Sequence, residues 1–335
     1  MILNEQQLTN ILTGALITWT ENGEFRMSRF TEKQLAFYAR KNGGELLKKA
    51  YATASMTLDF TSDADAISFD WWMKEASSRR FYHFDLYVDG VMCDHYDACR
   101  TENEYCGHVH FALPAGTHRV TLYLPNLMAT SLKNVTLDNA TFICPCKRSK
   151  KFYFVGDSIT QGYDAIYPSM SYVNRIAALM DADVLNQAVG SEIFDEDILD
   201  EHLPYDPSLV VIAYGTNDWA RCESHTAFIG GAAAFFDRAR KLFPMARIVY
   251  VSPIYRGETE KEESRVGEFF ACANELRLLA EQYGFDTIDG QTLVPHLSAF
   301  YSDRILHPND LGFSFYTENL IKALSDVTDT RQING

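Results

Sequence analysis

Four short motifs in the second half of the sequence contain the residue types that acyl transfer through a serine requires. They read VGDSITQG (155–162), NQAVGSE (186–192), YGTNDW (214–219) and HPNDLG (307–312). A serine nucleophile needs a general base, hydrogen-bond donors for the oxyanion and a group that orients the base. If the motifs meet at one point, the residues that supply the nucleophile, the donors and the base are Ser158, Gly190, Asn217 and His307. The predicted chemistry is therefore nucleophilic catalysis by a serine.

Each motif alone also has a purely structural interpretation. The Gly-Asp-Ser turn could be an ordinary helix cap, GTND a simple turn and HPND a helix start. The first motif is neither a phosphate-binding loop nor a G-x-S-x-G elbow. Because the structural interpretations would have to coincide four times, in order, we favour the catalytic one. Asp157 and Asp218, beside the predicted site residues, are expected to cap a helix or fix a turn.

The elements that would position these motifs alternate between strands and helices. Strands are predicted at KFYFVGDS, DVLNQA, SLVVIAYG, RIVYVSPI and FDTID, and helices at 171–180, 225–242, 263–283 and from Asp310. This alternation predicts an α/β fold with a mostly parallel sheet covered on both faces. Ligands bind at the carboxyl edge of such a sheet, and three of the four motifs follow predicted strands.

The first part of the chain shows a different pattern. From about residue 53 to 143, short alternating segments such as AISFDWW, FYHFDLYV and RVTLYL are separated by turn signals. They predict antiparallel strands in a β-sandwich or jelly roll, preceded by a helix at 31–40. The basic stretch CPCKRSKK (144–151) is expected to be a solvated linker. We therefore predict a β-sandwich domain at 1–147 and a second domain at 148–335.

With these motifs in this order, the segment from about 151 to 324 resembles the SGNH hydrolase superfamily, also called GDSL esterases and lipases. Ile159 stands where the name-giving pattern has leucine. The resemblance implies a flavodoxin-like three-layer α/β/α fold for the second domain. It also implies that Ser158 is the nucleophile and His307 the base.

The resemblance further implies which groups bind the oxyanion. These are the N–H groups of Ser158 and Gly190 and the side-chain amide of Asn217. The reaction is then attack by the serine oxygen on an ester carbonyl, while the histidine first accepts the proton and later returns one. It requires no cofactor and no metal ion.

The group that orients His307 departs from the family pattern. The family usually places a carboxylate three residues before the histidine, but Arg304 holds that position and the aspartate is Asp303, one residue earlier. Because one extra loop residue can bulge out, we predict that Asp303 still hydrogen-bonds to Nδ1 of His307. The alternatives are a backbone carbonyl in the stretch 304–306 and Asp303 as a plain turn residue.

The first domain makes the resemblance more specific. With LYVDG, LPAGTHRVTLYLPNL and the pattern of strands, the β-rich module before the SGNH domain is similar to that of the two-domain carbohydrate esterases. This similarity implies O-acetyl groups on a carbohydrate as substrate, and the acidic charge of the chain favours a neutral carbohydrate. Tyr163 and Trp219 could stack on a pyranose ring, although ordinary packing is the simpler explanation for either one. The alternative enzyme is an SGNH lysophospholipase or thioesterase for longer acyl chains. The alternative from another class is a carbohydrate-binding protein without catalysis.

Two further clusters contain metal-ligating residue types. One has spacings that match no common zinc pattern, so we expect surface or packing residues there. Its members are Cys93, His95, Cys99, Cys106, His108 and His110. The other is the acidic run SEIFDEDILDE (191–201), where a solvated loop is a simpler expectation than a cation site.

Charge and composition limit the partners. The formal net charge is -15, and residues 148–335 hold 28 acidic against 16 basic side chains, which would repel nucleic acid and anionic membranes. We expect a small-molecule or oligosaccharide ester as the partner, and the sequence does not indicate the oligomeric state. Seven scattered cysteines fit reduced thiols, and no signal or membrane segment is recognisable, so we expect a cytoplasmic protein.

Overall fold

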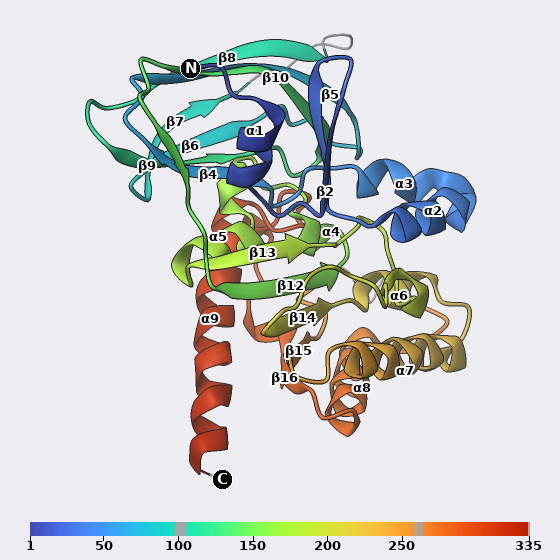
Figure 1. Cartoon of the computed structure of the whole chain (residues 1–335). Coiled ribbons are helices and arrows are strands. Elements are labelled where there is room, and N and C mark those ends of the chain that lie inside the picture. The colour runs from blue at the N-terminus through green and yellow to red at the C-terminus, as the bar shows by residue number, and fades with distance from the viewer. Residues whose placement is uncertain (98–104, 258, 260–263, 334–335) are drawn as a thin grey trace.

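The computed structural model of the protein describes residues 1–97, 105–257, 259 and 264–333. Figure 1 shows antiparallel strands from the N-terminal half above a parallel sheet with helices on both faces. The long helix α9 (Asp310–Ile333) runs down to the C-terminus in this view. An α/β domain preceded by an antiparallel β domain is the fold class that the sequence predicted.

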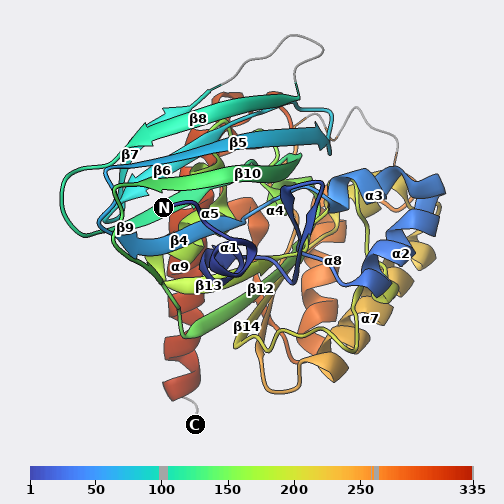
Figure 2. The same cartoon turned by 45° about the horizontal axis from the view of Figure 1, so that its top comes forward.

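Two antiparallel sheets form the first domain. One has the strand order β2-β3-β10-β5-β8, and the other has the order β1-β4-β9-β6-β7, with β11 added at β4. After the short helix α1 (Glu5–Ile11), the strands are β1 (Leu12–Thr13), β2 (Ile17–Glu21), β3 (Glu24–Ser28), β4 (Thr57–Ser62), β5 (Ala66–Glu75), β6 (Phe84–Val88), β7 (Val91–Tyr96), β8 (Cys106–Ala112), β9 (His118–Tyr123), β10 (Met128–Asp138) and β11 (Ile143–Pro145). Figure 2 shows β8, β5 and β10 side by side.

Strand β5 illustrates why these segments form a sandwich. Its residues Ile67, Phe69, Trp71 and Met73 are buried, whereas Trp72 between them is exposed. Successive side chains of a strand point to opposite faces of the sheet, so one face of β5 enters the core and the other faces outward. The alternation in AISFDWW therefore encodes both the strand and the side of it that is buried.

The second domain is built on a parallel sheet with the strand order β13-β12-β14-β15-β16. Numbered along the chain this order is 2-1-3-4-5, the flavodoxin-like order, in which ligands bind beside the first strand at the carboxyl edge. The strands are β12 (Lys150–Gly156), β13 (Ala182–Asn186), β14 (Leu209–Ala213), β15 (Arg247–Val251) and β16 (Asp286–Ile288). The helices between them are α4 (Ser158–Gln161), α5 (Tyr172–Leu179), α6 (Thr216–Arg221), α7 (His225–Leu242) and α8 (Phe269–Gln282).

Successive residues of β12 face opposite layers of helices. Tyr153 and Val155 belong to the core cluster that includes apolar residues of α7 and α8. Phe152 and Phe154 belong to the cluster that includes residues of α5 and α9. Burial on both faces explains why this strand reads as a continuous apolar run rather than an alternating one.

Helices α2 (Glu32–Arg40) and α3 (Glu45–Ala50) precede most of the sandwich in the sequence, but they pack against the second domain (Figure 1). Thr31 caps α2, where the sequence predicted a helix. Tyr38 of α2 and Leu46 of α3 are buried in the same core cluster as strands of the parallel sheet. These two helices therefore contribute to the core of the second domain.

Arg29, just before α2, joins the same interface. Its side chain is fully buried, and Nη1 donates to the carbonyls of Asn186 and Ala188 at 2.6 Å each. Nε donates to Ala52 O at 2.9 Å and Nη2 to Lys49 O at 3.0 Å. Burial lowers the pKa of this guanidinium to about 9. The residue ties the first domain to the chain that follows β13.

The acidic run 191–201 packs against helix α2 and does not form a solvated loop. Lys41, which follows α2, lies 2.7 Å from a carboxylate oxygen of Glu192 and 2.7 Å from one of Asp195. The side chain of Glu192 is fully buried. The expectation of a solvated segment is therefore wrong, because the run is a docking surface for the first part of the chain.

The basic stretch 144–151 also differs from its expectation as a solvated linker. Arg148 donates to Asp59 of β4 at 2.8 Å and to the carbonyls of Ala177 and Ala182 in the second domain, at 3.2 and 2.9 Å. Asp59 is fully buried and also pairs with Arg119 at 2.7 Å. The stretch therefore fastens the two domains together.

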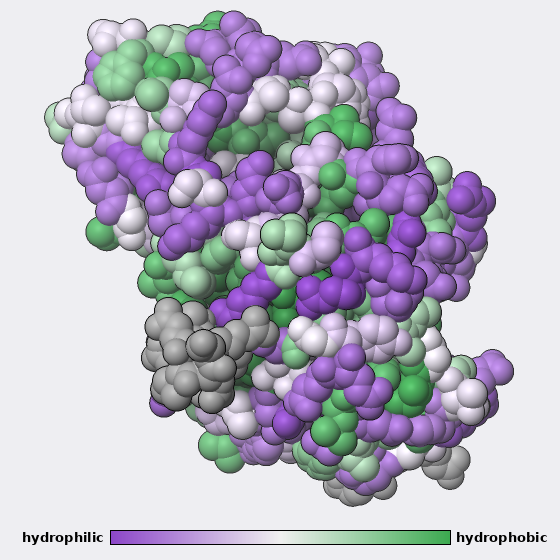
Figure 3. Space-filling model, turned by 60° about the horizontal axis from the view of Figure 1, so that its bottom comes forward, coloured by the Kyte–Doolittle hydropathy of each residue, from purple (hydrophilic) through white to green (hydrophobic). Residues whose placement is uncertain are grey.

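Hydrophilic and hydrophobic residues are interspersed on the face of the molecule shown in Figure 3. Single exposed apolar side chains, such as Leu179 and Met245, are common on soluble proteins. Within the described ranges, no helix combines the length and the apolar character that crossing a bilayer requires.

Candidate active site

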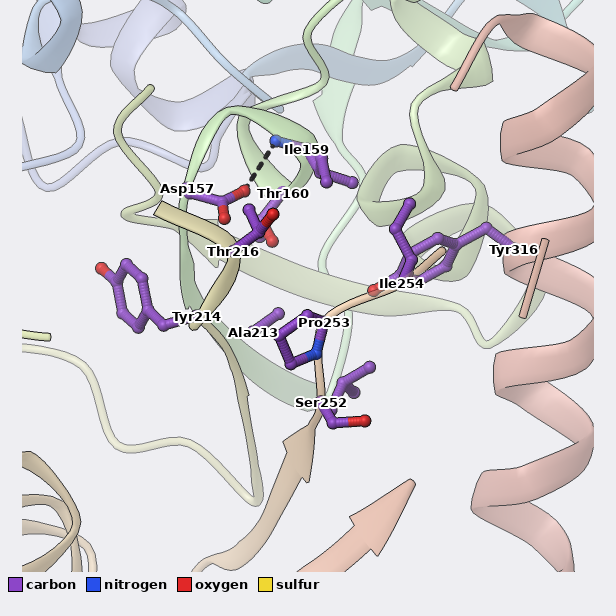
Figure 4. Close-up of a pocket in the computed structure, with 11 residues that line it drawn as sticks. Asp157, Ile159, Thr160, Ala213, Tyr214, Thr216, Ser252, Pro253, Ile254 and Tyr316 are labelled. Atoms are coloured by element: carbon purple, nitrogen blue, oxygen red, sulfur yellow. Dashed lines mark hydrogen bonds between the residues drawn. The ribbon is translucent and has the colours of Figure 1, made fainter. Parts of the chain in front are cut away.

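Ser158 lies at the carboxyl end of β12 and is the first residue of α4. Asp157 caps this short helix by accepting the N–H of Ile159 at 2.9 Å (Figure 4). Burial raises the pKa of Asp157 to about 6. The carboxylate thus holds the turn that presents the serine, which is the structural role expected from the sequence.

A small pocket of about 20 Å³ lies beside this turn (Figure 4). Asp157, Thr160 and Tyr316 are among its lining residues, but neither Ser158 nor His307 is. The pocket has room for about one water molecule. This pocket is therefore too small to hold an ester, and it is not lined by the serine.

His307 brings its imidazole to Ser158 from the loop before α9. Nε2 of the histidine lies 3.0 Å from Oγ of the serine, although the two residues are 149 positions apart. A bridge between Tyr301 and Pro308 closes the loop, and the N–H of Ser302 donates to the His307 carbonyl at 2.8 Å. The imidazole is thus held on a backbone that is itself hydrogen-bonded.

Asp303 hydrogen-bonds to the other ring nitrogen of His307. Oδ2 lies 2.7 Å from Nδ1, while Oδ1 accepts the N–H groups of Ile305, Leu306 and His307 at 2.9, 2.7 and 3.1 Å. Arg304 has a left-handed φ of 67° and forms the bulge that brings the two side chains together. Burial opposes ionisation of Asp303, but the hydrogen bonds from His307 and the backbone outweigh it and lower the pKa of this carboxyl.

Gly190 lies against the serine, where a donor for the oxyanion was predicted. A Cβ added to Gly190 would stand 3.6 Å from Cβ of Ser158. Its N–H, however, donates to Oε1 of Gln161 at 2.7 Å. The structure therefore places Gly190 at the site but shows its donor engaged by a buried amide that sequence reasoning did not single out.

Asn217, at the start of α6, faces the segment that follows Gly190. Its Nδ2 donates to the carbonyl of Glu192 at 3.0 Å, which leaves the second amide hydrogen for another acceptor. The neighbouring Asp218 accepts the N–H of Phe194 at 2.8 Å, and burial raises its pKa to about 7. Asp218 therefore fixes the loop that Asn217 contacts.

Of the two aromatic residues predicted to bind substrate, Tyr163 lies beside the histidine and Trp219 lies in the core. The ring of Tyr163 lies beside that of His307, with 4.7 Å between the ring centroids, and its hydroxyl contacts Ser78. Trp219 is 2% exposed, packs on Phe269 and donates from Nε1 to Gly267 O at 2.9 Å. The prediction is therefore wrong for Trp219, because its ring is part of the core and cannot stack on a sugar.

The first domain contributes a cation to the surroundings of His307. Arg79, in the loop after β5, lies 2.5 Å from a carboxylate oxygen of Asp164, and its guanidinium stands over the ring of Tyr163. Asp164 is almost fully buried. Sequence reasoning missed this pair because Arg79 and Asp164 are 85 positions apart.

Strand β6 and the residue before it form hydrogen bonds with the chain that follows helix α4. Nδ1 of His83 lies 2.6 Å from the carbonyl of Ile166, and Asp85 accepts the N–H of Ser169 at 2.8 Å. Tyr87 donates to Oγ of Ser169 at 3.1 Å. Asp85 and Tyr87 alternate along β6 and share one face of it, so the strand, together with His83 just before it, presents polar side chains to the second domain.

The described residues contain one group of carboxylates and imidazole that lie close enough to hold a cation. Ligand atoms of Asp164, Asp303 and His307 lie within 4.8 Å of one another. Arg79 already pairs with Asp164, and Nε2 of the histidine already contacts Ser158. These residues therefore fit a network of ion pairs and hydrogen bonds better than a metal site.

Histidines of the predicted cysteine–histidine cluster have partners of their own. His95 hydrogen-bonds to Asp85 at 2.6 Å and His108 to Asp70 at 2.8 Å. Cys99 lies outside the described residues.

Comparisons with known proteins agree with this architecture. Residues 154–314 match the model of the GDSL-like lipase/acylhydrolase family. The matched segment contains all four motifs from Ser158 to His307. The resemblance to the SGNH/GDSL hydrolases is thus confirmed. A search of curated protein sequences finds no match.

Solved structures share the fold of both domains. The salicylyl-acyltransferase SsfX3 from a tetracycline biosynthetic pathway has a TM-score of 0.77 and 20% sequence identity, and the alignment covers 95% of this chain and 94% of that one. A family two carbohydrate esterase from Cellvibrio japonicus has a TM-score of 0.60 and 17% identity, covering 92% and 97%. One from Clostridium thermocellum, in complex with cellohexaose, has a TM-score of 0.58 and 19% identity, covering 82% and 92%.

Proposed function

Taking residues 154–314 as a GDSL-like acylhydrolase domain, we propose that this protein is a serine esterase that removes short acyl groups, principally acetyl, from a neutral carbohydrate. One observation carries the proposal. It is the hydrogen-bonded line from Asp303 through His307 to Ser158, with separations of 2.7 and 3.0 Å. Such a line activates a serine hydroxyl, because the imidazole can take its proton while the carboxylate holds the imidazole in place.

In the first half of the reaction, Oγ of Ser158 attacks the ester carbonyl and Nε2 of His307 takes the hydroxyl proton. Asp303 stabilises the imidazolium that forms, because its carboxylate is ionised and accepts from Nδ1. The histidine then protonates the leaving sugar oxygen, and the acyl group stays on the serine. In the second half, His307 takes a proton from water, the resulting hydroxide attacks the acyl-enzyme, and the serine leaves with that proton.

The oxyanion needs donors at the serine. The N–H of Ser158 starts helix α4 and has no acceptor in the described part of the chain, and Asn217 has one amide hydrogen left over. The N–H of Gly190 can also bind the oxyanion only if its hydrogen bond to Gln161 breaks. Donors that are already in position when charge develops lower the barrier most effectively.

The choice of a carbohydrate ester rests on fold and charge. Structures of the same two-domain fold include carbohydrate esterases, one of them bound to cellohexaose. A formal charge of -15 disfavours an anionic substrate. A neutral acetylated sugar satisfies both observations.

A rate series with p-nitrophenyl esters from acetate to palmitate tests the acyl length. We expect kcat/KM to be highest for acetate and to fall as the chain lengthens. A maximum at long chains would instead indicate a lysophospholipase or thioesterase. Acetate release from acetylated xylan, acetylated mannan and small acetylated sugars then identifies the carbohydrate.

Ser158→Ala is the control for both assays. We expect it to remove the activity. An unchanged rate in this variant would rule out the serine mechanism and favour a binding protein without catalysis at this site.

A second candidate is transfer of the acyl group to an acceptor hydroxyl in place of water. The alignment of both domains with an acyltransferase structure favours a test of this reaction. The acyl-enzyme would be the same, and only the attacking oxygen would differ. Product analysis in the presence of a sugar acceptor distinguishes free acetate from an acetylated acceptor.

A further inference from the structure

A groove of about 770 Å³ lies on the outer face of the sheet that contains β2, β3, β10 and β5. None of the predicted site residues lines it. Helix α3 forms one wall through Lys48 and Tyr51. Figure 2 shows α3 close to one end of β5 and β10. A pocket of this size is in the range of ligand sites in proteins.

Two tryptophans lie in one row across the floor of this groove. Trp19 is opposite Arg26, and Ser131 is opposite Trp72. Because Phe25 is opposite Leu132, Arg26 and Ser131 are neighbours too. The row therefore reads Trp19, Arg26, Ser131, Trp72 over four adjacent strands. Three strand intervals place the two indoles roughly 14 Å apart, which is longer than a single pyranose ring.

The polar groups between the indoles are mutually paired. Arg26 lies 2.6 Å from Glu21 and 3.0 Å from Glu24, and Ser131 donates to the same oxygen of Glu24 at 2.9 Å. Trp72 keeps 36% of its surface exposed. Trp19 is half-buried. One exposed and one half-buried indole beside paired charges and a hydroxyl suit a ligand that has apolar ring faces and many hydroxyl groups but no net charge.

The rest of the lining is nearly balanced in charge. Lys48 and Lys74 add two cations and Glu75 one anion to the paired groups on the floor. This balance fits a neutral chain better than a polyanion, whose charges would need a clear excess of cations.

Residues next to the groove contact residues beside the serine and the histidine at two places. Lys49, the residue between Lys48 and the end of α3, donates to the carbonyl of Gly190 at 2.8 Å. Glu75 lines the groove, and Ser78, three residues later, contacts Tyr163 beside the histidine. Three residues span at most about 11 Å.

We propose that this groove binds a neutral oligosaccharide chain and holds the part of a polymeric substrate that lies away from the ester. Its role in delivering an acetylated unit to Ser158 rests on the proposed esterase activity, whereas binding of the chain itself does not. The substrate class would then be an acetylated polysaccharide or oligosaccharide rather than a single acetylated sugar.

The binding test uses the full chain with Ser158→Ala, titrated calorimetrically with unsubstituted xylohexaose, cellohexaose and mannohexaose. We expect one of these to bind, and we expect Trp72→Ala and Trp19→Ala each to raise its Kd by roughly tenfold. Phe142→Ala is the matched control, since Phe142 is equally exposed at 38% but lies outside the groove, and it should leave Kd unchanged. Absence of binding by all three sugars, or binding only of an anionic oligogalacturonate, would overturn the proposal.

A second measurement separates the groove from the chemistry. In the enzyme with Ser158 intact, Trp72→Ala should lower the ratio of kcat/KM for an acetylated hexasaccharide to that for an acetylated monosaccharide by roughly tenfold. An equal loss on both substrates would contradict a remote binding role. If the protein binds the oligosaccharide but hydrolyses no ester, the proposed function fails while the groove stands.

Discussion

Asp303 Oδ2 lies 2.7 Å from His307 Nδ1 although one residue more than usual separates the two side chains in the loop. The left-handed backbone at Arg304 accommodates that residue. The three N–H groups that Oδ1 accepts fix the carboxylate independently of the imidazole. Of the three interpretations that the sequence left open, the geometry favours the carboxylate over a backbone carbonyl or a plain turn residue.

Asp303→Asn should therefore lower kcat strongly. The amide can still accept the backbone N–H groups, but it cannot stabilise an imidazolium, so we expect a loss of roughly 10² to 10⁴ in kcat on p-nitrophenyl acetate. His307→Ala provides the reference for complete loss. Near-wild-type activity in Asp303→Asn beside an inactive His307→Ala would reduce the triad to a serine–histidine dyad.

Asn217→Ala should reduce kcat by roughly 10² to 10³ and leave KM nearly unchanged, because an oxyanion donor acts mainly in the transition state. Circular dichroism and the melting temperature check that the loss of the bond to Glu192 O has not unfolded the loop. A rise in KM at constant kcat would assign Asn217 to substrate binding.

Arg79→Ala should move the acidic limb of the kcat/KM profile to higher pH. Without the guanidinium, the buried carboxylate of Asp164 lies unpaired beside His307, and an additional negative charge favours the imidazolium, which cannot act as a base. Arg79→Lys should restore much of the original profile. A uniform drop in activity with an unchanged profile would indicate a purely structural pair.

Asp218→Asn should stabilise the protein above neutral pH. The folded-state pKa of Asp218 is raised to about 7, so the folded protein binds this proton more tightly than the unfolded chain. Stability from this group is therefore present below about pH 4 and decreases as the pH rises toward 7. Because an amide is neutral without binding a proton, the gain in the free energy of unfolding at pH 8 should be on the order of 1 to 4 kcal/mol. The free energy of unfolding is measured with urea at pH 5 and pH 8 for the wild type and the variant. If its change with pH is the same in both proteins, Asp218 is not the group that titrates.

Lys41→Ala should destabilise the fold by roughly 3 kcal/mol, because it leaves the buried carboxylate of Glu192 without its cation. Lys33→Ala, in the first turn of α2, is the matched control. Lys33 also pairs with the acidic run, but its side chain is 54% exposed, and its partners are the half-exposed Glu201 at 3.1 Å and, at 3.6 Å, the buried Asp200. Asp200 keeps hydrogen bonds from Thr31 and the N–H of His202, so the loss of Lys33 should be undetectable in urea denaturation. Equal effects of the two substitutions would show that burial of Glu192 is not the cause.

The fold class, and the places of Ser158, Gly190, Asn217 and His307 within it, could be predicted from local signals. Ser158, Gly190 and Asn217 each follow a strand that is buried on both faces, and His307 precedes a capped helix. The parallel order of those strands then places their ends at one edge.

The hairpin of β2 and β3 could also have been predicted, because Asn22-Gly23 is the dipeptide that such turns favour. Both residues have positive φ, at 55° and 75°. Its flanking strands, ITWTE and EFRMS, alternate between apolar and polar residues, but each has only five residues, and the sequence analysis did not identify them.

What sequence reasoning could not reach depends on pairs far apart in the chain. Trp219 follows a strand like a site residue, but its indole turns inward to Gly267, and nothing in its neighbours encodes that direction. The carboxylates that Arg79 and Lys41 neutralise stand 85 and 151 positions away in the sequence.

Because of Arg29, neither domain can easily be replaced by a domain from another protein. Its guanidinium satisfies the carbonyls of Asn186 and Ala188, two positions from Gly190, and it can do so only when the segment before α2 is seated. A different β-sandwich joined to residue 148 would lack this donor and leave both carbonyls in a dry interior. A chimera designed from either half would therefore need its own donor for these two carbonyls.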